Sequence, residues 1–73
     1  MSQLTIIVNG EKTNVADTST LSELVNSLGL NPQRVAIELN RRIVRRTNWE
    51  STTISEGDHI EIVHFVGGGS VHV

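Results

Sequence analysis

The stretch EGDHIEIVHFVGGG, residues 56–69, decides the fold because a turn signal, a long apolar strand and three glycines follow one another directly. Residues 56–58 are Glu, Gly and Asp, which are typical turn residues. Residues 59–66 are rich in Ile and Val and predict the last strand of the chain. The sequence therefore predicts a sheet whose final strand runs straight into glycines.

Side chains alternate along this last strand, so its two faces differ in character. Ile60 and Ile62 share the face that would turn toward a core. Val63 and Phe65 share the opposite face with Glu61. Large apolar side chains that face outward beside a terminal segment indicate a docking surface for a partner. A β-bulge could instead turn Phe65 inward, and alternation alone does not exclude this alternative.

The chain opens with a predicted β-hairpin. Leu4, Ile6 and Val8 alternate onto one face, and an Asn-Gly pair follows at residues 9–10. Asn and Gly tolerate the positive φ angles of a type I′ turn. The return strand is expected over residues 11–15.

A short amphipathic helix is predicted next. Thr20 and Glu23 have the spacing of a capping box, which satisfies free amide groups at a helix start. Gly29 suits the C-terminal cap, and Pro32 prevents the helix from resuming nearby. The apolar stripe expected to lie on the sheet has the spacing i, i+3, i+4 and i+7 and consists of Leu21, Leu24, Val25 and Leu28.

Further segments between the helix and the last strand complete the order β-β-α-β-β-β. Residues 35–39 predict a strand, and a short extended piece is expected around Ile43 and Val44. Residues 47–50 predict a turn or a brief helical turn, in which we interpret Trp49 as a cap on one end of the core and not as a binding residue. This order predicts an α+β fold, with a mixed sheet of four to five strands packed on one helix.

Length and composition limit the possible functions. The 73 residues suffice for one domain, expected over residues 1–66 with a flexible tail over residues 67–73, and a deep catalytic cleft is not expected. The chain has no cysteine, so any sulfur that it handles must be acquired. The net charge of −2 argues against a nucleic-acid partner. We expect a cytoplasmic protein, because we find no leader pattern and no apolar run near the ~20 residues of a membrane span.

The sequence offers no recognisable local motif for catalysis by side chains. The histidines are His59, His64 and His72, and no serine is paired with a base in a local motif. His59 and His64 are five residues apart on one strand, so they point to opposite faces and cannot share a metal ion in regular geometry. We therefore expect no metal site and no catalytic residue.

The charge cluster of the chain consists of Arg41, Arg42, Arg45 and Arg46. Such a cluster could bind an anion, nucleic acid or an acidic partner surface, or it could remain solvated. Because several acidic residues lie elsewhere on so small a domain, we favour solvated or partner-facing arginines over nucleic-acid binding.

The glycine run Gly67, Gly68 and Gly69 is the unusual feature of the chain. Three consecutive glycines lose much conformational entropy on ordering, which predicts a mobile tail. Composition alone favours a plain linker or flexible terminus. The outward apolar residues of the preceding strand favour a different interpretation, in which a docking surface guides the tail into a partner's site.

These residues together resemble the ThiS family, the sulfur carrier proteins of thiamine thiazole synthesis, which have a ubiquitin-like β-grasp fold. The resemblance covers nearly the whole chain through Gly69. It rests on the hairpin, the helix stripe, residues 36–44, the Trp49 region and, most specifically, residues 56–69. The related small subunit of molybdopterin synthase usually carries a proline-containing approach to its Gly-Gly.

The resemblance implies that the protein is a substrate and not an enzyme. An adenylating enzyme of the ubiquitin-activating type would use ATP to activate a glycine carboxylate, and a cysteine desulfurase relay would supply the sulfur of a thiocarboxylate. Thiazole synthase would then take this sulfur, and no cofactor is expected on the carrier itself. By position, Gly69 or alternatively Gly68 holds the carboxylate. The nearest candidates for partner contact are Val63, Phe65 and Val66.

One departure from the family concerns the end of the chain. Family members end at the glycines, whereas residues 70–73, Ser-Val-His-Val, follow here, so adenylation of this form should fail. A protease could remove these residues, they could have been added to the natural chain, or this homologue could have lost the carrier role. Two other functions stay open: a sulfur carrier for molybdopterin, cysteine or another cofactor, and a ubiquitin-like modifier or interaction module.

Overall fold

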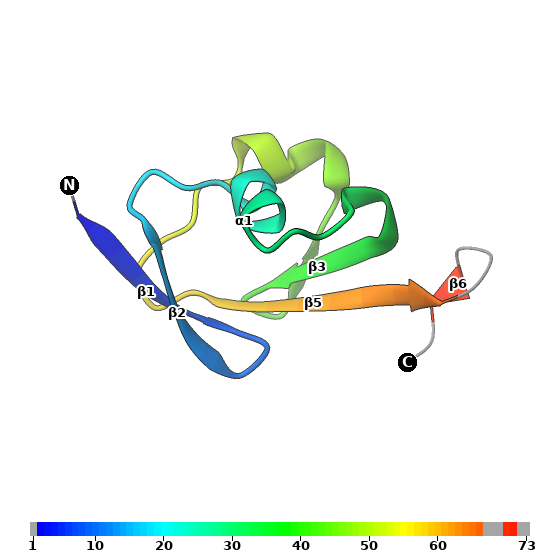
Figure 1. The fold of residues 1–73 in the computed structure, drawn as a ribbon, viewed down its shortest axis with the longest axis horizontal. Coiled ribbons are helices and arrows are strands. Elements are labelled where there is room, and N and C mark those ends of the chain that lie inside the picture. The colour runs from blue at the N-terminus through cyan, green and yellow to red at the C-terminus, as the bar shows by residue number, and fades with distance from the viewer. Residues whose placement is uncertain (1, 67–69, 72–73) are drawn as a thin grey trace.

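A mixed β-sheet that carries one α-helix forms the fold in this computed structural model, which describes residues 2–66 and 70–71 (Figure 1). The elements in chain order are β1 (Gln3–Val8), β2 (Glu11–Ala16), α1 (Leu21–Ser27), a 3-10 helix (Pro32–Arg34), β3 (Val35–Leu39), β4 (Arg42–Val44), a second 3-10 helix (Arg46–Ser51), β5 (His59–Val66) and β6 (Ser70–Val71). Within these described residues, no helix is long and apolar enough to cross a membrane. The predicted order is observed, and the second 3-10 helix covers the turn or brief helical turn expected at residues 47–50. The first 3-10 helix and β6 were not predicted.

The strands lie in the order β2-β1-β5-β3-β4, and β6 pairs with β5 outside this path. β1 and β5 are parallel, with Ile7 opposite His59 and Val8 opposite Ile60. The pairs β1–β2, β3–β4 and β3–β5 are antiparallel. The sheet is therefore mixed and centred on β5, which confirms the predicted α+β class.

The opening hairpin turns at the Asn-Gly pair, as predicted. Val8 pairs with Glu11, so the loop has only two residues. Asn9 and Gly10 have φ angles of 49° and 84°, which lie in the left-handed region that a type I′ turn requires. The return strand runs one residue further than expected, to Ala16.

Helix α1 begins with the predicted capping box. The Thr20 hydroxyl accepts a hydrogen bond from the Glu23 amide at 3.2 Å, and the Glu23 carboxylate accepts one from the Thr20 amide at 2.9 Å. Leu21, Leu24 and Val25 are buried against the sheet. These local bonds and the apolar face together explain why a helix of only seven residues is stable here.

The predicted helix stripe is wrong at its last residue. Leu28 is 43% exposed and does not join the core. The helix ends at Ser27, so Leu28 is the C-cap, and Gly29 then adopts a φ angle of 71°. Since the chain turns away at this point, the i+7 position no longer faces the sheet.

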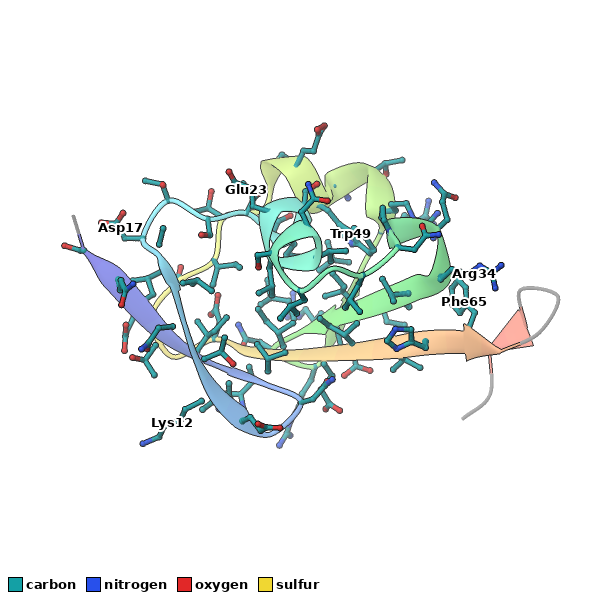
Figure 2. All side chains as sticks on the ribbon, in the orientation of Figure 1. Lys12, Asp17, Glu23, Arg34, Trp49 and Phe65 are labelled. Carbon is teal, nitrogen blue, oxygen red and sulfur yellow. The ribbon has the colours of Figure 1, made fainter. Side chains whose placement is uncertain are left out.

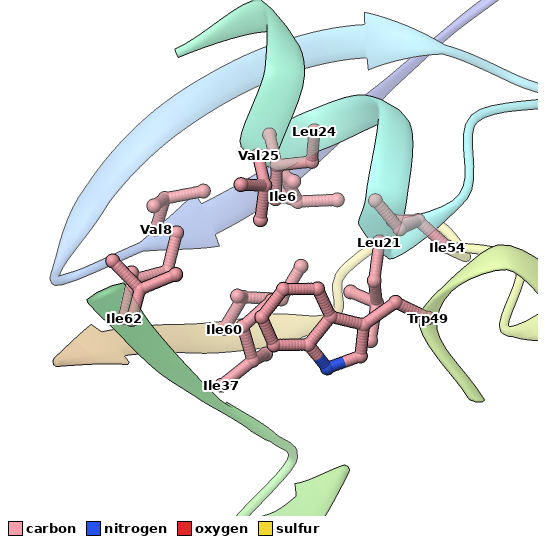
Figure 3. Close-up of a cluster of buried hydrophobic side chains, with 11 residues drawn as sticks. Ile6, Val8, Leu21, Leu24, Val25, Ile37, Trp49, Ile54, Ile60 and Ile62 are labelled. Carbon is pink, nitrogen blue, oxygen red and sulfur yellow. The ribbon is translucent and has the colours of Figure 1, made fainter. Parts of the chain in front are cut away.

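The core fills the space between α1 and the sheet (Figure 3). Its side chains come from β1, α1, β3, β5 and the segment around the second 3-10 helix. They are Ile6, Val8, Leu21, Leu24, Val25, Val35, Ile37, Trp49, Ile54, Ile60 and Ile62. All of these residues precede the glycines, so a chain that ends at Gly69 retains the whole core.

Trp49 closes one end of the core, as predicted. Its ring is buried, and its indole N–H donates a hydrogen bond to the Val44 carbonyl at 2.9 Å. The bond satisfies the polar edge of a large apolar side chain, which a buried tryptophan needs. The sequence analysis missed Ile54, which is buried beside it in a segment without regular structure.

Replacing Thr20 with Ala should lower the free energy of unfolding by about 1 kcal/mol, because the Glu23 amide loses its capping acceptor. Urea unfolding followed by circular dichroism measures this change. Thr18→Ala, at an exposed threonine two residues earlier, is the control and should shift stability by less than about 0.5 kcal/mol. Equal losses in the two variants would contradict a specific capping role.

Candidate functional site: the open sheet face and the end of β5

The two faces of the sheet have different surroundings. Figure 1 shows α1 and the second 3-10 helix on the same side of the sheet. Ile60 and Ile62 of β5 point to this covered side and are buried. Glu61 and Val63 lie on the opposite, open face, and Val63 is 41% exposed. The outward position predicted for Val63 is confirmed.

Strand register extends the open face onto β3 and β4. Ala36 lies opposite Val63, and Glu38 lies opposite Glu61. Ile43 lies opposite Glu38 and so shares its face. At 78% exposure, Ile43 is the most exposed large apolar residue among those described. We name these five residues, Ala36, Glu38, Ile43, Glu61 and Val63, the open-face patch.

The open-face patch combines apolar and acidic groups. Ile43 and Val63 offer exposed apolar surface, and the carboxylates of Glu38 and Glu61 lie directly opposite each other on neighbouring strands. Like charges in this arrangement oppose strand pairing. Arg41 and His59 line the same hollow as these two residues, and a partner that brings apolar side chains and basic groups would complement the rest of the patch. The patch is therefore suited to protein docking.

Ile43 is the site residue that sequence reasoning missed. Its segment was expected to be extended, but nothing local shows which face Ile43 occupies. The face follows from the register that sets Ile43 opposite Glu38. The only local signal was a bulky isoleucine beside several arginines, where a buried residue is not expected.

Phe65 is neither a core residue nor a fully exposed one. Its side chain is half-buried near the end of β5. Val35 pairs with His64, so the preceding residue, Arg34, comes close to Phe65, and Figure 2 shows the two side chains near each other. Phe65 thus leaves part of its ring free for a partner.

The four arginines are all exposed but differ in their contacts. Arg46 is engaged within the fold, because its Nε donates a hydrogen bond to the Pro32 carbonyl at 2.8 Å and its guanidinium lies 5.7 Å from the centre of the Trp49 ring. Arg41, Arg42 and Arg45 are exposed. These three stay solvated or partner-facing candidates, as the sequence indicates.

The histidines of β5 do not assemble a metal centre. His59 and His64 are both exposed and stand five positions apart on the strand. In the part of the chain that the structure describes, no three His, Cys, Asp or Glu side chains gather closely enough to hold a metal ion.

The tail residues 67–69, which include the predicted thiocarboxylate site Gly69 or Gly68, lie outside the described residues. The structure resumes at β6, where Ser70 pairs with Val66 and Val71 pairs with Phe65. This pairing brings the chain after the glycines back alongside the end of β5, and the sequence analysis did not anticipate it.

Parallel first and last main strands, two flanking antiparallel pairs and a helix across one face define a ubiquitin-like β-grasp protein. The model of the ThiS family matches residues 2–69 of the chain. The chain therefore belongs to the ThiS family of sulfur carrier proteins, as the resemblance predicted.

Relatives support this membership at the level of structure and sequence. The crystal structure of the thiamine biosynthesis protein ThiS from Geobacter metallireducens matches 90% of this chain and 100% of its own, with 32% identity and a TM-score of 0.79. The sulfur carrier protein ThiS of Bacillus subtilis is 40% identical over 53 residues, which are 73% of this chain and 80% of that protein.

Two other relatives are much longer than this chain. The thiazole synthase of Paramagnetospirillum magneticum is 37% identical over 65 residues, which are 89% of this chain. The thiazole synthase of Magnetococcus marinus is 42% identical over 64 residues, which are 88% of this chain. The chain spans only 20% of the length of each. In both proteins the ThiS-like region is thus a small part of a longer polypeptide.

Replacing Ile43 with Ala should change the free energy of unfolding by less than about 0.5 kcal/mol, because the side chain is 78% exposed. The matched variant Ile37→Ala on neighbouring β3 removes a side chain that is 1% exposed and should cost about 2–5 kcal/mol. Chemical denaturation of both variants measures the difference. A large loss for Ile43→Ala would mean that this residue is part of the core and not of a docking face.

Proposed function

We propose that the protein is a sulfur carrier of thiamine thiazole biosynthesis, with Gly69 as the residue whose carboxylate is activated. The observation that carries this proposal is the family match, which begins at Ser2 and ends at Gly69, the last residue of the glycine run. The similarity therefore extends through the glycine run and is not confined to the folded domain.

The chemistry of the proposal belongs to the tail backbone. An oxygen of the Gly69 carboxylate attacks the α-phosphate of ATP and expels pyrophosphate, which yields an acyl-adenylate. The terminal sulfur of a persulfide from a cysteine desulfurase relay then displaces AMP and forms an acyl disulfide. A thiol attacks the relay-side sulfur of this disulfide, which forms a new disulfide on the relay and leaves the thiocarboxylate. Glycine suits both steps because, without a Cβ, it passes through a narrow channel and leaves the carbonyl open to attack. ATP is consumed by the activating enzyme.

Thiazole synthase is the proposed acceptor of the sulfur. Support comes from the two thiazole synthases in which a ThiS-like region occupies a fifth of the polypeptide. Carrier and acceptor joined in one chain would keep the donor at a high local concentration beside the site that uses it. A separate carrier needs a docking surface to achieve the same result.

The open-face patch and the end of β5 are the proposed docking surface for the adenylating enzyme. Val63 and Phe65 are partly accessible, and Val66 ends the strand that leads into the glycines. A partner that binds this surface therefore also lies beside the start of the tail. The protein itself then acts as a substrate of two enzymes in the cytoplasm and not as an enzyme.

The proposal predicts a mass change that depends on residues 70–73. Incubation with a thiamine-pathway adenylating enzyme, ATP and a sulfur donor should add roughly 16 mass units, one sulfur-for-oxygen exchange, to a chain that ends at Gly69. The 73-residue chain should stay unchanged, because its Gly69 has no free carboxylate. Intact-mass spectrometry measures both forms. If neither form gains mass, the proposed carrier function in this pathway is contradicted.

A second experiment tests the docking surface. Val63→Ser in the chain ending at Gly69 should raise the KM of the adenylating enzyme by roughly 5- to 30-fold, because an apolar contact worth about 1–2 kcal/mol is lost. Leu28→Ser is the matched control: Leu28 is 43% exposed, close to the 41% of Val63, but lies at the end of α1. Equal KM values for the two variants would place the docking surface elsewhere.

A further inference from the structure

The last strand loses one of its neighbours well before its end. β1 accompanies β5 only as far as Ile60, which pairs with Val8, and the chain of β1 then turns into the hairpin. β5 continues to Val66, and in Figure 1 it runs well past the region where it meets β1. On its other edge, β3 follows β5 as far as His64. Among the described strands, residues 61–64 of β5 therefore pair with β3 alone, before β6 pairs with Phe65 and Val66.

Beyond the point where β1 stops pairing with β5, the side chain of Asn9 hydrogen-bonds to β5 in place of a strand backbone. The Asn9 amide N–H donates to the Ile60 carbonyl at 2.9 Å, which is the last backbone bond from this side. Beyond it, Asn9 Oδ1 accepts a hydrogen bond from the Ile62 amide at 2.8 Å, and Asn9 Nδ2 donates to the Ile62 carbonyl at 3.4 Å. One carboxamide thus supplies the acceptor and the donor that two successive pairing residues of β1 would have offered to Ile62 if the parallel pair had continued.

The turn conformation makes this contact possible. Asn9 has a φ angle of 49°, so its backbone already leaves the line of β1 while its side chain stays close to β5. Both hydrogen bonds join residues 53 positions apart and are partly buried. Partial burial makes them costly to lose, because a shielded amide or carbonyl without a partner is penalised.

We propose that Asn9 is a positioning residue for the glycine tail, and this inference rests on the proposed function. Val66 lies four positions after Ile62, a length of about 13 Å at the rise of an extended strand. A tilt of ten degrees at Ile62 would therefore move Val66 by roughly 2 Å. Errors of about 1 Å in the position of a reacting group can cost on the order of a hundredfold in rate. By holding Ile62, Asn9 sets the direction in which β5 delivers the tail.

Asn40 provides an internal control for this role. It too has a left-handed φ angle, 51°, and its side chain also binds β5, with Oδ1 accepting from the His59 amide at 2.9 Å and Nδ2 donating to Asp58 Oδ1 at 3.0 Å. This contact lies at the first residue of β5, where β1 also pairs with the strand. Loss of the Asn40 contact should therefore affect stability without redirecting the end of β5.

The test compares Asn9→Gly, Asn40→Gly and Asn9→Asp in the chain that ends at Gly69. Glycine keeps the left-handed backbone at either position, so both glycine variants should fold and lose only side-chain bonds. Asn9→Gly should lower kcat for adenylation about tenfold and leave KM within about twofold, since the open-face patch is intact. Asn40→Gly should leave kcat unchanged. Asn9→Asp should recover part of the rate, because it retains the acceptor for the Ile62 amide.

A second measurement uses the full 73-residue chain without any partner. NMR order parameters of the Val63–Phe65 amides should fall in Asn9→Gly and stay near those of the parent chain in Asn40→Gly. An unchanged kcat in Asn9→Gly, or an equal loss in Asn40→Gly, would overturn the positioning role. If the unsubstituted chain that ends at Gly69 is not adenylated at all, the proposed function fails. The order parameters then still decide whether Asn9 orders the end of β5.

Discussion

The parallel pairing of β1 with β5 is the contact on which the rest of the structure depends. It joins residues 7 and 8 to residues 59 and 60, so the first and last main strands become neighbours at the centre of the sheet. The hairpin partner of β1 and the β3–β4 pair then extend the sheet on either side. Loop closure over about fifty residues costs entropy. The favourable free energy of burying apolar side chains from both strands under α1 offsets that entropy cost.

This central pairing also divides the molecule into a structural face and a free face. Ile6 and Val8 of β1 and Ile60 and Ile62 of β5 all turn toward α1, because the two strands are in register. Residues at the alternate positions are left on the open face. The same strand alternation that completes the core therefore exposes Val63 at 41%, and the proposed docking surface needs no element of its own.

Much of the fold could be predicted from local sequence, because its elements carry local signals. The Asn-Gly hairpin, the capping box and the alternating pattern of β5 each act within a few residues, and each was confirmed. The failures have non-local causes. Leu28 has the spacing of a core residue, but the end of the helix turns it outward. Ile54 has no periodic neighbours, and it is buried only because an irregular segment crosses the core.

The candidate site shows the same division between local and non-local information. The glycines and the outward position of Val63 follow from the sequence of one strand. Ile43 reaches the same face only through the β3–β4 register, and Asn9 meets Ile62 only after β1 has paired with β5. A turn residue and a strand residue 53 positions apart leave no shared local pattern.

A carrier whose reactive group belongs to the main chain places unusual demands on its fold. No side chain has to be activated, so the domain need not build a pocket or shift a pKa for this chemistry. It must instead present the tail in a fixed direction from a surface that partners can hold. Both requirements would fall on β5, whose inward residues anchor it in the core while its outward residues Val63 and Phe65 stay accessible to the proposed partner. The side chain of Asn9 adds a hydrogen-bonded support where β1 leaves this strand. In a carrier of the proposed kind, the strand that stabilises the fold is also the strand that leads into the reactive tail.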